Sequence, residues 1–310
     1  MLPVRIGIKR ARSCHMARKS KERISLYGMV SAMLIFGTVG LLRRFIPLSS
    51  ALLAFSRGML GGLFLLVFLK LRRKKAVSRP PLSTALRLIL TGAAMGINWL
   101  LLFEAYNYTT VAVATLCYYM QPTIVILLSP LLFKEKLTSK KAVCAAAAIL
   151  GMVLVSGVIG GEKGQGNNLK GIAFGLSAAV FYAFVVIMNK RTPGVDAYSK
   201  TTVQLFSAGA VMLPYLLMTG GFQFEALRPL TMVLLLVAGI LHTGIAYVLY
   251  FGSMDGLKAQ SVAILSYIDP VAALLFSAIF LREPLSAAGV VGAILIIGSA
   301  VLSEAEKGRR

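Results

Sequence analysis

The feature that most limits how this 310-residue chain can fold is a series of long apolar runs, separated by clusters of charged residues. Each run is close to the roughly 20 residues that a helix needs to cross a bilayer. Hydrophobic residues make up 57% of the chain and charged residues only 14%, whereas a soluble domain has roughly 45–50% apolar residues. In lipid, only helices and closed barrels satisfy the backbone internally. Because a transmembrane barrel would show short alternating segments instead, the sequence predicts an all-α integral membrane protein.

The apolar runs predict ten transmembrane helices. They are expected near residues 25–45, 50–69, 82–103, 111–133, 139–158, 169–189, 201–219, 229–251, 259–281 and 285–303. Some of the connections between them are very short, so the helices on either side should form antiparallel hairpins.

The distribution of lysine and arginine predicts how these helices are oriented. If the N-terminus is inside the cell, the inner segments hold 25 of the 33 basic residues and the outer segments hold 6. The remaining two, Arg57 and Arg87, lie within spans. Because cytoplasmic segments carry the excess of Lys and Arg, both termini are predicted to be cytoplasmic.

The net charge of +22 does not indicate a nucleic-acid partner, because basic residues beside apolar spans follow from the positive-inside rule. The basic N-terminal segment, residues 1–24, also lacks interleaved aromatic residues and the apolar core of a signal peptide. We expect a disordered cytoplasmic tail that lies against anionic lipid. Met16 offers an alternative start, since MARKSKERIS is itself a sufficient basic leader.

One stretch of the chain occurs twice. Tyr119–Thr138 reads YMQPTIVILLSPLLFKEKLT, and Tyr267–Ser286 reads YIDPVAALLFSAIFLREPLS, at a constant offset of 148. The identical positions are Tyr119/Tyr267, Pro122/Pro270, Leu127/Leu275, Ser129/Ser277, Glu135/Glu283 and Leu137/Leu285. A repeat of this length indicates a duplicated structural unit.

The position of the repeat predicts two inverted halves. Residues 25–158 form the first repeat with spans 1–5, and residues 169–303 form the second with spans 6–10. The glycine-rich, polar segment 159–168 is the expected linker, and 304–310 is a short cytoplasmic tail. Because each half has an odd number of spans, the halves insert in opposite orientations. Inverted repeats are typical of transporters that alternate access around a central site, although some channels also have them.

The repeated motif resembles that of a known family. It consists of an apolar helix with a mid-span proline, then a glutamate, then Leu-Thr or Leu-Ser opening the next helix. With its ten spans, the chain resembles the EamA-type transporters of the drug/metabolite transporter superfamily over residues 25–303. This resemblance implies two five-helix bundles, a central cavity lined mainly by spans 1, 3, 4, 6, 8 and 9, and movement of small metabolites, often amino acids. The sequence departs from many members at Lys134 and Arg282, where those have glycine.

Two prolines and two glutamates of the motif are interpreted as structural. Pro122 and Pro270 should kink spans 4 and 9, because proline removes a backbone hydrogen bond and clashes with the carbonyl four residues earlier. The kink can shape a cavity or serve packing alone. Glu135 and Glu283 should fix the tight hairpin that follows each span and help to cap it. The residues three positions later, Thr138 and Ser286, are natural N-caps for spans 5 and 10.

The residues just before the two prolines are the first candidates for a substrate site. Tyr118 corresponds to Ser266 in the repeat, and Gln121 corresponds to Asp269. The two residues in each span are three positions apart and therefore lie on one helix face. Polar side chains at this depth face a bundle interior or a cavity rather than lipid, and a substrate site is expected near the bilayer midplane.

Two charged residues are predicted to lie deep in the membrane. An ionised carboxylate at Asp269 costs a few kcal/mol or more there, so we hypothesise that Asp269 binds a substrate amine or carries a proton. A hydrogen-bonded carboxyl that locks span 9 to its neighbour is an equal alternative. Arg57 can meet a substrate carboxylate, but we favour a structural charge that is paired inside the bundle or snorkels outward.

Five other residues complete the candidate substrate site. Trp99 in span 3 matches Tyr247 in span 8 at the same offset of 148, and the two aromatic rings can form opposite walls of one cavity. Asn98 lies beside Trp99, and Tyr182 lies in span 6. His242 in span 8 can titrate near neutral pH. Interhelical packing is the alternative for each of these side chains.

These observations favour a secondary transporter for a small metabolite over an enzyme. The chain has no phosphate-cradling GxxxxGK[ST] loop, so transport should use an ion gradient or the gradient of the substrate. No metal or other cofactor is expected, because Cys14, Cys117 and Cys144 lack the spacing of a metal site. An integral membrane enzyme or a channel is a weaker alternative, and a multidrug exporter of the same fold is the main rival. The expected partners are a small-molecule substrate and membrane lipid, with a monomer as one possible assembly.

Overall fold

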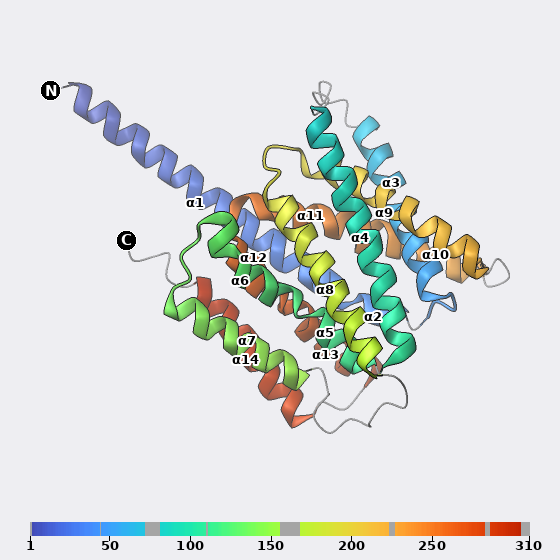
Figure 1. Cartoon of the computed structure of the whole chain (residues 1–310). Helices are drawn as coiled ribbons and strands as arrows, with labels where there is room; N and C mark the ends of the chain where they lie inside the picture. The colour runs from blue at the N-terminus through green and yellow to red at the C-terminus, as the bar shows by residue number, and fades with distance from the viewer. Residues whose placement is uncertain are drawn as a thin grey trace.

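The computed structural model describes residues 2–43, 45–71, 81–109, 111–155, 168–222, 227–282 and 286–304, and all regular structure in these ranges is helical (Figure 1). The helices of the first half are α1 (Leu2–Gly37), α2 (Val39–Arg43), α3 (Ser50–Leu71), α4 (Leu82–Tyr108), α5 (Val111–Tyr118), α6 (Gln121–Phe133) and α7 (Ser139–Val155). Those of the second half are α8 (Asn168–Lys190), α9 (Ala197–Thr219), α10 (Pro229–Gly239), η2 (Ile240–Ile245), α11 (Ala246–Ser253), η3 (Met254–Gly256), α12 (Ala259–Ser266), α13 (Ile268–Leu281) and α14 (Ala287–Glu304).

Each predicted span coincides with one of these helices or with consecutive helical pieces. Within the described residues, eight helical segments are long and apolar enough to cross a membrane. The helices α7 and α14 are shorter, at 17 and 18 residues. The all-helical fold class is therefore confirmed, while the count of ten crossings stays a prediction.

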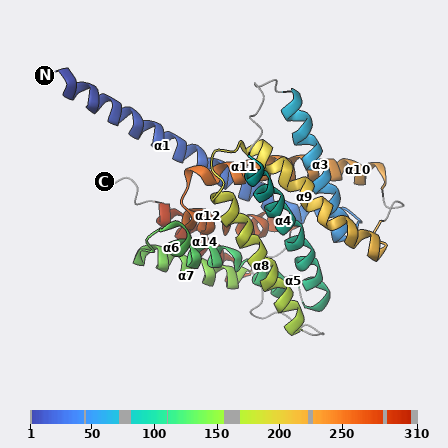
Figure 2. The same ribbon diagram turned by 45° about the horizontal axis from the view of Figure 1, so that its top comes forward.

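The N-terminal region corrects one expectation. Residues 1–24 were expected to be disordered, but α1 runs without a break from Leu2 to Gly37 and projects far beyond the helical bundle (Figures 1 and 2). No proline or glycine lies between Gly7 and Gly28. Lys, Arg, Ala and Met are good helix formers, and extending an existing helix costs far less than starting one. The apolar span therefore continues into its basic leader as a helix.

Spans 4 and 9 are both interrupted at the residues that precede their prolines. In span 4, α5 ends at Tyr118 and α6 begins at Gln121, with Pro122 in its first turn. In span 9, α12 ends at Ser266 and α13 begins at Ile268, just before Pro270. Proline fits the first turn of a helix, whereas in the interior it kinks or breaks the helix. Each span is divided into two helices near its middle, and the motif proline lies in the first turn of the second helix.

Span 8 contains a different irregularity. A π-helical segment, η2, lies between α10 and α11 and includes His242 and Thr243. The hydroxyl of Thr243 donates a 2.8 Å hydrogen bond to the carbonyl oxygen of Ala238. Single π-helical turns inside α-helices occur frequently at functional sites. Here the turn lies beside α3, where Gly61 and Gly239 bring the two backbones close together.

The two halves pack against each other through equivalent spans. The helix α3 (span 2) packs on α9 (span 7), α6 (span 4) packs on α12 (span 9), and α7 (span 5) packs on α14 (span 10). In Figures 1 and 2, α7 and α14 lie side by side at one edge of the bundle, whereas α3, α9 and α10 lie at the opposite edge. Other contacts between the halves also occur twice, once in each copy of the repeat. The helix α8 packs on α4 and on α5–α6, and its equivalent α1 packs on α11 and on α12–α13.

The sequence-equivalent spans 4 and 9 run antiparallel. At the break in span 4, Tyr119 is hydrogen-bonded to Asp269. Further along span 4, Ser129 is hydrogen-bonded to Gln260, which precedes Asp269 in the chain. Residue numbers therefore rise along span 4 as they fall along span 9. At the end of α6, the carboxylate of Glu135 lies at the first residues of α12.

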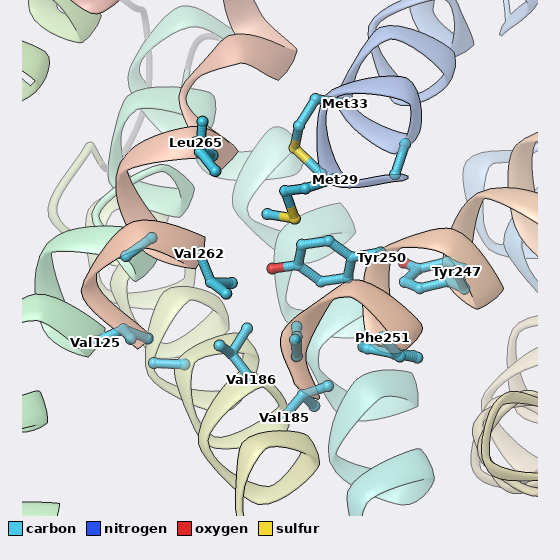
Figure 3. Close-up of a cluster of buried hydrophobic side chains, with 14 of the residues drawn as sticks. Met29, Met33, Val125, Val185, Val186, Tyr247, Tyr250, Phe251, Val262 and Leu265 are labelled. Carbon is cyan, nitrogen blue, oxygen red and sulfur yellow. The ribbon is translucent and has the colours of Figure 1, made fainter. Parts of the chain in front are cut away.

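The core of the bundle lies where α1, α8, α11 and α12 meet (Figure 3). Tyr250 is fully buried there. Its ring lies among Met29, Val262 and Val186, with its hydroxyl directed toward α12 (Figure 3), at 3.5 Å from the hydroxyl oxygen of Ser266. This cluster fills the interior on one side of the cavity described next.

Candidate functional site

A cavity of about 340 Å³ lies between the two halves of the chain. Its walls come from α1 to α6 in the first half and from α8, α11, α12 and α13 in the second. The lining includes Met33, Phe36, Arg57, Trp99, Tyr106, Thr115, Tyr118, Tyr119, Gln121, Tyr182, Tyr247, Ser266 and Asp269. Aromatic side chains are therefore the most numerous group in the lining, which has one basic and one acidic side chain among its described residues.

Aromatic pairs form the walls of this cavity. The rings of Tyr118 and Tyr182 are stacked, with centroids 5.5 Å apart and an interplanar angle of 7°. On another side, the ring of Tyr247 lies 6.4 Å from Trp99 and makes an edge contact with Phe36 at 5.1 Å. Such pairs hold flat apolar surfaces in fixed positions, which suits contact with a rigid or aromatic solute.

The acidic side of the cavity is Asp269, which lies near the start of α13. The hydroxyl of Tyr119 donates a 2.9 Å hydrogen bond to Oδ2 of this carboxylate. Beside this contact, the hydroxyls of Thr123 and Tyr267 are hydrogen-bonded at 2.8 Å. Both contacts join span 4 to span 9, so the interrupted regions of the two equivalent spans are fixed to each other at the cavity.

The basic side of the cavity is Arg57 on α3. Its guanidinium carbon lies 5.3 Å from the centre of the Trp99 ring, a cation–π arrangement that desolvated sites strengthen. Its charge is also close enough to act on Tyr247 and His242. Nε of Arg57 has no hydrogen-bond partner among the described residues, and within the same ranges neither Arg57 nor Asp269 is in an ion pair.

The structure brings together most of the residues that the sequence nominated for a substrate site. The cavity is lined by Trp99, Tyr118, Gln121, Tyr182, Tyr247, Ser266 and Asp269. Trp99 and Tyr247, which are related by the repeat, lie in contact with each other on one side of the cavity and not on opposite walls. Gln121 is 2% exposed, and its amide nitrogen has no partner within the described ranges.

Two nominated residues lie outside the cavity lining. Asn98 is fully buried and donates a 2.6 Å hydrogen bond to the carbonyl oxygen of Ala178, so it joins α4 to α8. Nε2 of His242 lies 2.8 Å from the hydroxyl of Thr38, and its Nδ1 lies 3.3 Å from the carbonyl oxygen of Val237. Both side chains hold helices together at the periphery of the cavity.

Glu135 has a different structural contact from the expected one. Its carboxylate accepts hydrogen bonds from the backbone N–H groups of Ala259 (2.8 Å) and Gln260 (3.2 Å), the first residues of α12 in the other half. The expected capping of its own hairpin is made by Thr138, whose hydroxyl oxygen accepts from the N–H of Lys141 at 3.3 Å. A carboxylate satisfies the free N–H groups and the positive end of a helix wherever one comes within reach, and the antiparallel packing of α6 on α12 brings one there.

The second copy of this hairpin is described only in part. Glu283 lies outside the described residues. The hydroxyl oxygen of Ser286 accepts a 3.0 Å hydrogen bond from the N–H of Gly289, as Thr138 does in the first copy. The residues that precede the glutamates, Lys134 and Arg282, have left-handed backbone angles, with φ of 54° and 55°. Glycine adopts this conformation without steric cost, so a glycine at either position would relieve the strain.

Arg57 of span 2 lies in the cavity lining, which the sequence did not predict. A single charge in an apolar span by default indicates a functional site, but a structural charge was the favoured interpretation. Nothing in the spacing of the chain places α3 beside the cavity. Tyr119 was also missed as a cavity residue, although it is one of the identical positions of the repeat.

Comparison with known proteins gives a consistent result. The sequence model of the EamA-like transporter family matches residues 23–157 and again residues 169–304. The uncharacterized transporter YxxF of Bacillus subtilis strain 168 is 29% identical over 259 residues, covering 81% of this chain and 80% of that protein. Protein PecM of Dickeya dadantii strain 3937 is 30% identical over 231 residues, covering 72% and 75%. One solved crystal structure superposes with a TM-score of 0.80 at 21% identity, over 93% of this chain and 97% of the other.

Proposed function

This chain belongs to the EamA-like transporter family, and from that premise we propose that it carries small amphipathic metabolites, amino acids among them, through the cavity between its two halves. The protein is a multi-pass membrane transporter of the cell membrane. The proposal concerns what it carries and how.

The observation that carries the proposal is the composition of the cavity. It is large enough for a small metabolite at about 340 Å³, and it combines aromatic walls with one guanidinium and one carboxylate. Ligand sites are typically concave and apolar, with a few polar groups that fix orientation. A substrate with an apolar part and charged groups fits such a lining.

The arrangement supports alternating access between the two halves. The interrupted spans 4 and 9 meet at the cavity, and transporter sites are typically built from such discontinuous helices near the midplane. Rocking of one half against the other would expose the cavity to one side of the membrane at a time. Binding energy from a substrate that contacts both halves would favour one arrangement over the other.

The core of the bundle supports a closed cytoplasmic side. Along α8, α11 and α12, the cavity residues Tyr182, Tyr247 and Ser266 are followed toward one end of the bundle by core residues such as Val186, Tyr250 and Val262. The count of Lys and Arg predicts that this end is cytoplasmic. An arrangement with both termini in the cytoplasm would therefore have its cavity shut off from the cell interior.

Transport can be tested in vesicles reconstituted with the purified protein. Uptake and efflux of a labelled amino-acid panel would be followed at two opposite pH gradients, with protein-free vesicles as the control. We expect at least one amino acid to move faster than in the control, and Asp269→Asn to lose the response to the pH gradient if Asp269 carries a proton. Pumping of lipophilic cations with no movement of any amino acid would favour the multidrug exporter instead.

A further inference from the structure

We infer that the cavity recognises the two charges of a zwitterionic substrate separately, with Arg57 contacting its carboxylate and Asp269 contacting its ammonium group. The inference rests on the proposed transport function and names the chemical class of the substrate. It also assigns a specificity-determining role to Arg57, which the sequence alone favoured as structural.

Two opposite charges line one cavity without neutralising each other. Arg57 and Asp269 both lie in the lining, and neither is in an ion pair within the described ranges. Charged side chains inside the membrane are costly and are usually paired. A solute with one negative and one positive group would supply the missing partner of each.

Asp269 and Arg57 both have hydrogen-bonding positions that the described residues leave unused. Asp269 receives the hydroxyl of Tyr119 on Oδ2, which leaves Oδ1 without a hydrogen bond from the described residues. An ionised carboxylate has about four acceptor positions. Arg57 rests on the face of Trp99 and also contacts the hydroxyl of Tyr247. Its Nε–H has no partner among the described residues, and a guanidinium has five N–H donors, so donors remain for a carboxylate.

The two charges belong to different halves of the chain. Arg57 lies on α3 in the first half and Asp269 on α13 in the second. A zwitterion bound between them would bridge the halves, whereas a solute with one charge would contact one half and leave the other charge unpaired. A simple cation would also meet the repulsion of Arg57, so this arrangement selects against lipophilic cations as well as for zwitterions.

The chain contains a built-in reporter for this inference. Trp99 is its single tryptophan, it lines the cavity, and Arg57 covers its ring. Excitation at the red edge of tryptophan absorption would therefore report on binding in the cavity alone. Three ligand series would be titrated on the full-length protein in detergent: L-phenylalanine with 2-phenylethylamine and 3-phenylpropionate, L-leucine with its amine and acid counterparts, and L-serine with ethanolamine and 3-hydroxypropionate.

Each ligand series is titrated on the parent protein and on two variants, Asp269→Asn and Arg57→Gln. For the series whose amino acid binds most tightly, we expect Asp269→Asn to weaken the amino acid at least about tenfold and to leave the acid counterpart unchanged. We expect Arg57→Gln to weaken the amino acid by a similar factor and to bind the amine counterpart at least as tightly as the parent does, because the repulsion of the guanidinium is gone. These factors correspond to loss of a hydrogen bond to a charged group. Retained binding of the acid or amine counterpart shows in each case that the variant is folded.

Charge removal outside the cavity provides the matched control. Arg43 on α2 donates a hydrogen bond to the carbonyl oxygen of Ile46 and is not part of the lining, so Arg43→Gln should bind all three ligands as the parent does. The inference is overturned if either variant weakens all three ligands of a series equally. It is also overturned if the amine or the acid alone binds as tightly as the amino acid.

The inference and the proposed function fail in different ways. If vesicles move a lipophilic cation while Trp99 fluorescence shows no amino-acid binding, transport stands and zwitterion recognition is refuted. If vesicles containing folded protein move none of the tested solutes, the proposed function is refuted as well.

Discussion

The hydroxyl of Tyr119 in the first half donates a 2.9 Å hydrogen bond to the carboxylate of Asp269 in the second. The two residues occupy the interrupted regions of spans 4 and 9, which are related by the repeat and run antiparallel. Their contact therefore links the halves at the cavity itself. It also holds the carboxylate in one orientation toward the cavity.

Replacing Tyr119 by Phe should weaken substrate binding without unfolding the protein. The ring stays in place, but Asp269 loses the hydrogen-bond donor that orients it. Loss of a hydrogen bond to a charged acceptor typically costs about tenfold in affinity. We expect the KM for the transported amino acid to rise by several-fold up to about tenfold in vesicles. The matched control is Tyr267→Phe, which removes only the hydrogen bond to Thr123 and should have a smaller effect. An equal effect of both substitutions would contradict this reading of the contact.

The sequence was sufficient to predict the class of fold and much of the cavity, because both depend on local patterns. Apolar runs define the spans, and the repeat relates Tyr118 to Ser266 and Gln121 to Asp269, all of which line the cavity. Polar residues inside apolar helices avoid lipid, so their burial followed from composition. The breaks in spans 4 and 9 likewise fall beside the two prolines.

The remaining features depend on contacts between distant segments. Glu135 reaches α12 only because α6 and α12 lie antiparallel. The local sequence pattern does not predict which residues of these two helices lie side by side. Arg57 faces the cavity because of how α3 is rotated in the bundle. His242 and Asn98 satisfy backbone groups or hydroxyls beside the cavity instead, and the sequence alone does not distinguish such a bond from a ligand contact.

Replacing Glu135 by Ala should destabilise the protein by about 1 kcal/mol, the usual cost of losing a helix cap. Two backbone N–H groups of α12 would lose their acceptor. For a chain of this size, the expected fall in Tm in detergent is on the order of 2 °C. Lys136→Ala is the control, because Lys136 is exposed on the same hairpin and should leave Tm unchanged. If Glu135→Ala melted at the same Tm as Lys136→Ala, the contact between Glu135 and α12 would not stabilise the protein.

Replacing Lys134 by Gly should not destabilise the protein and is expected to stabilise it by up to about 1 kcal/mol. Lys134 has a φ of 54°, and a residue with a Cβ atom pays roughly 1–2 kcal/mol for this left-handed conformation. The greater freedom of glycine in the unfolded chain offsets part of that gain. Lys134→Val, with a branched Cβ atom, should be less stable than the parent. A thermal melt that ranks Val above Gly would exclude left-handed strain at this position.

The orientation predicted from charge can be tested with single cysteines. In a background without the three native cysteines, Gly194→Cys lies in the turn between α8 and α9, and Gly220→Cys lies just after α9. If the positive-inside rule applies, a membrane-impermeant maleimide added to whole cells should label the second position and not the first. Lysed cells should show labelling at both. The reverse pattern in whole cells would place both termini outside.

Close packing of α4 on α9 should make Gly92 and Gly96 sensitive to substitution. A Cβ atom at Gly92 would lie 2.5 Å from the carbonyl oxygen of Gln204, and one at Gly96 would lie 2.6 Å from that of Ala208. These neighbours are backbone atoms that cannot rotate away, so the helices must separate. Overpacking of this kind typically costs about 1–3 kcal/mol, and we expect Gly92→Ala and Gly96→Ala each to lower Tm by a few degrees.

The control is Gly298→Ala in α14, where a Cβ atom meets nothing within 4 Å. That change should leave Tm unchanged or raise it, because alanine favours a helix by about 1 kcal/mol over glycine. Equal melting of all three variants would show that small residues do not determine the spacing of α4 and α9.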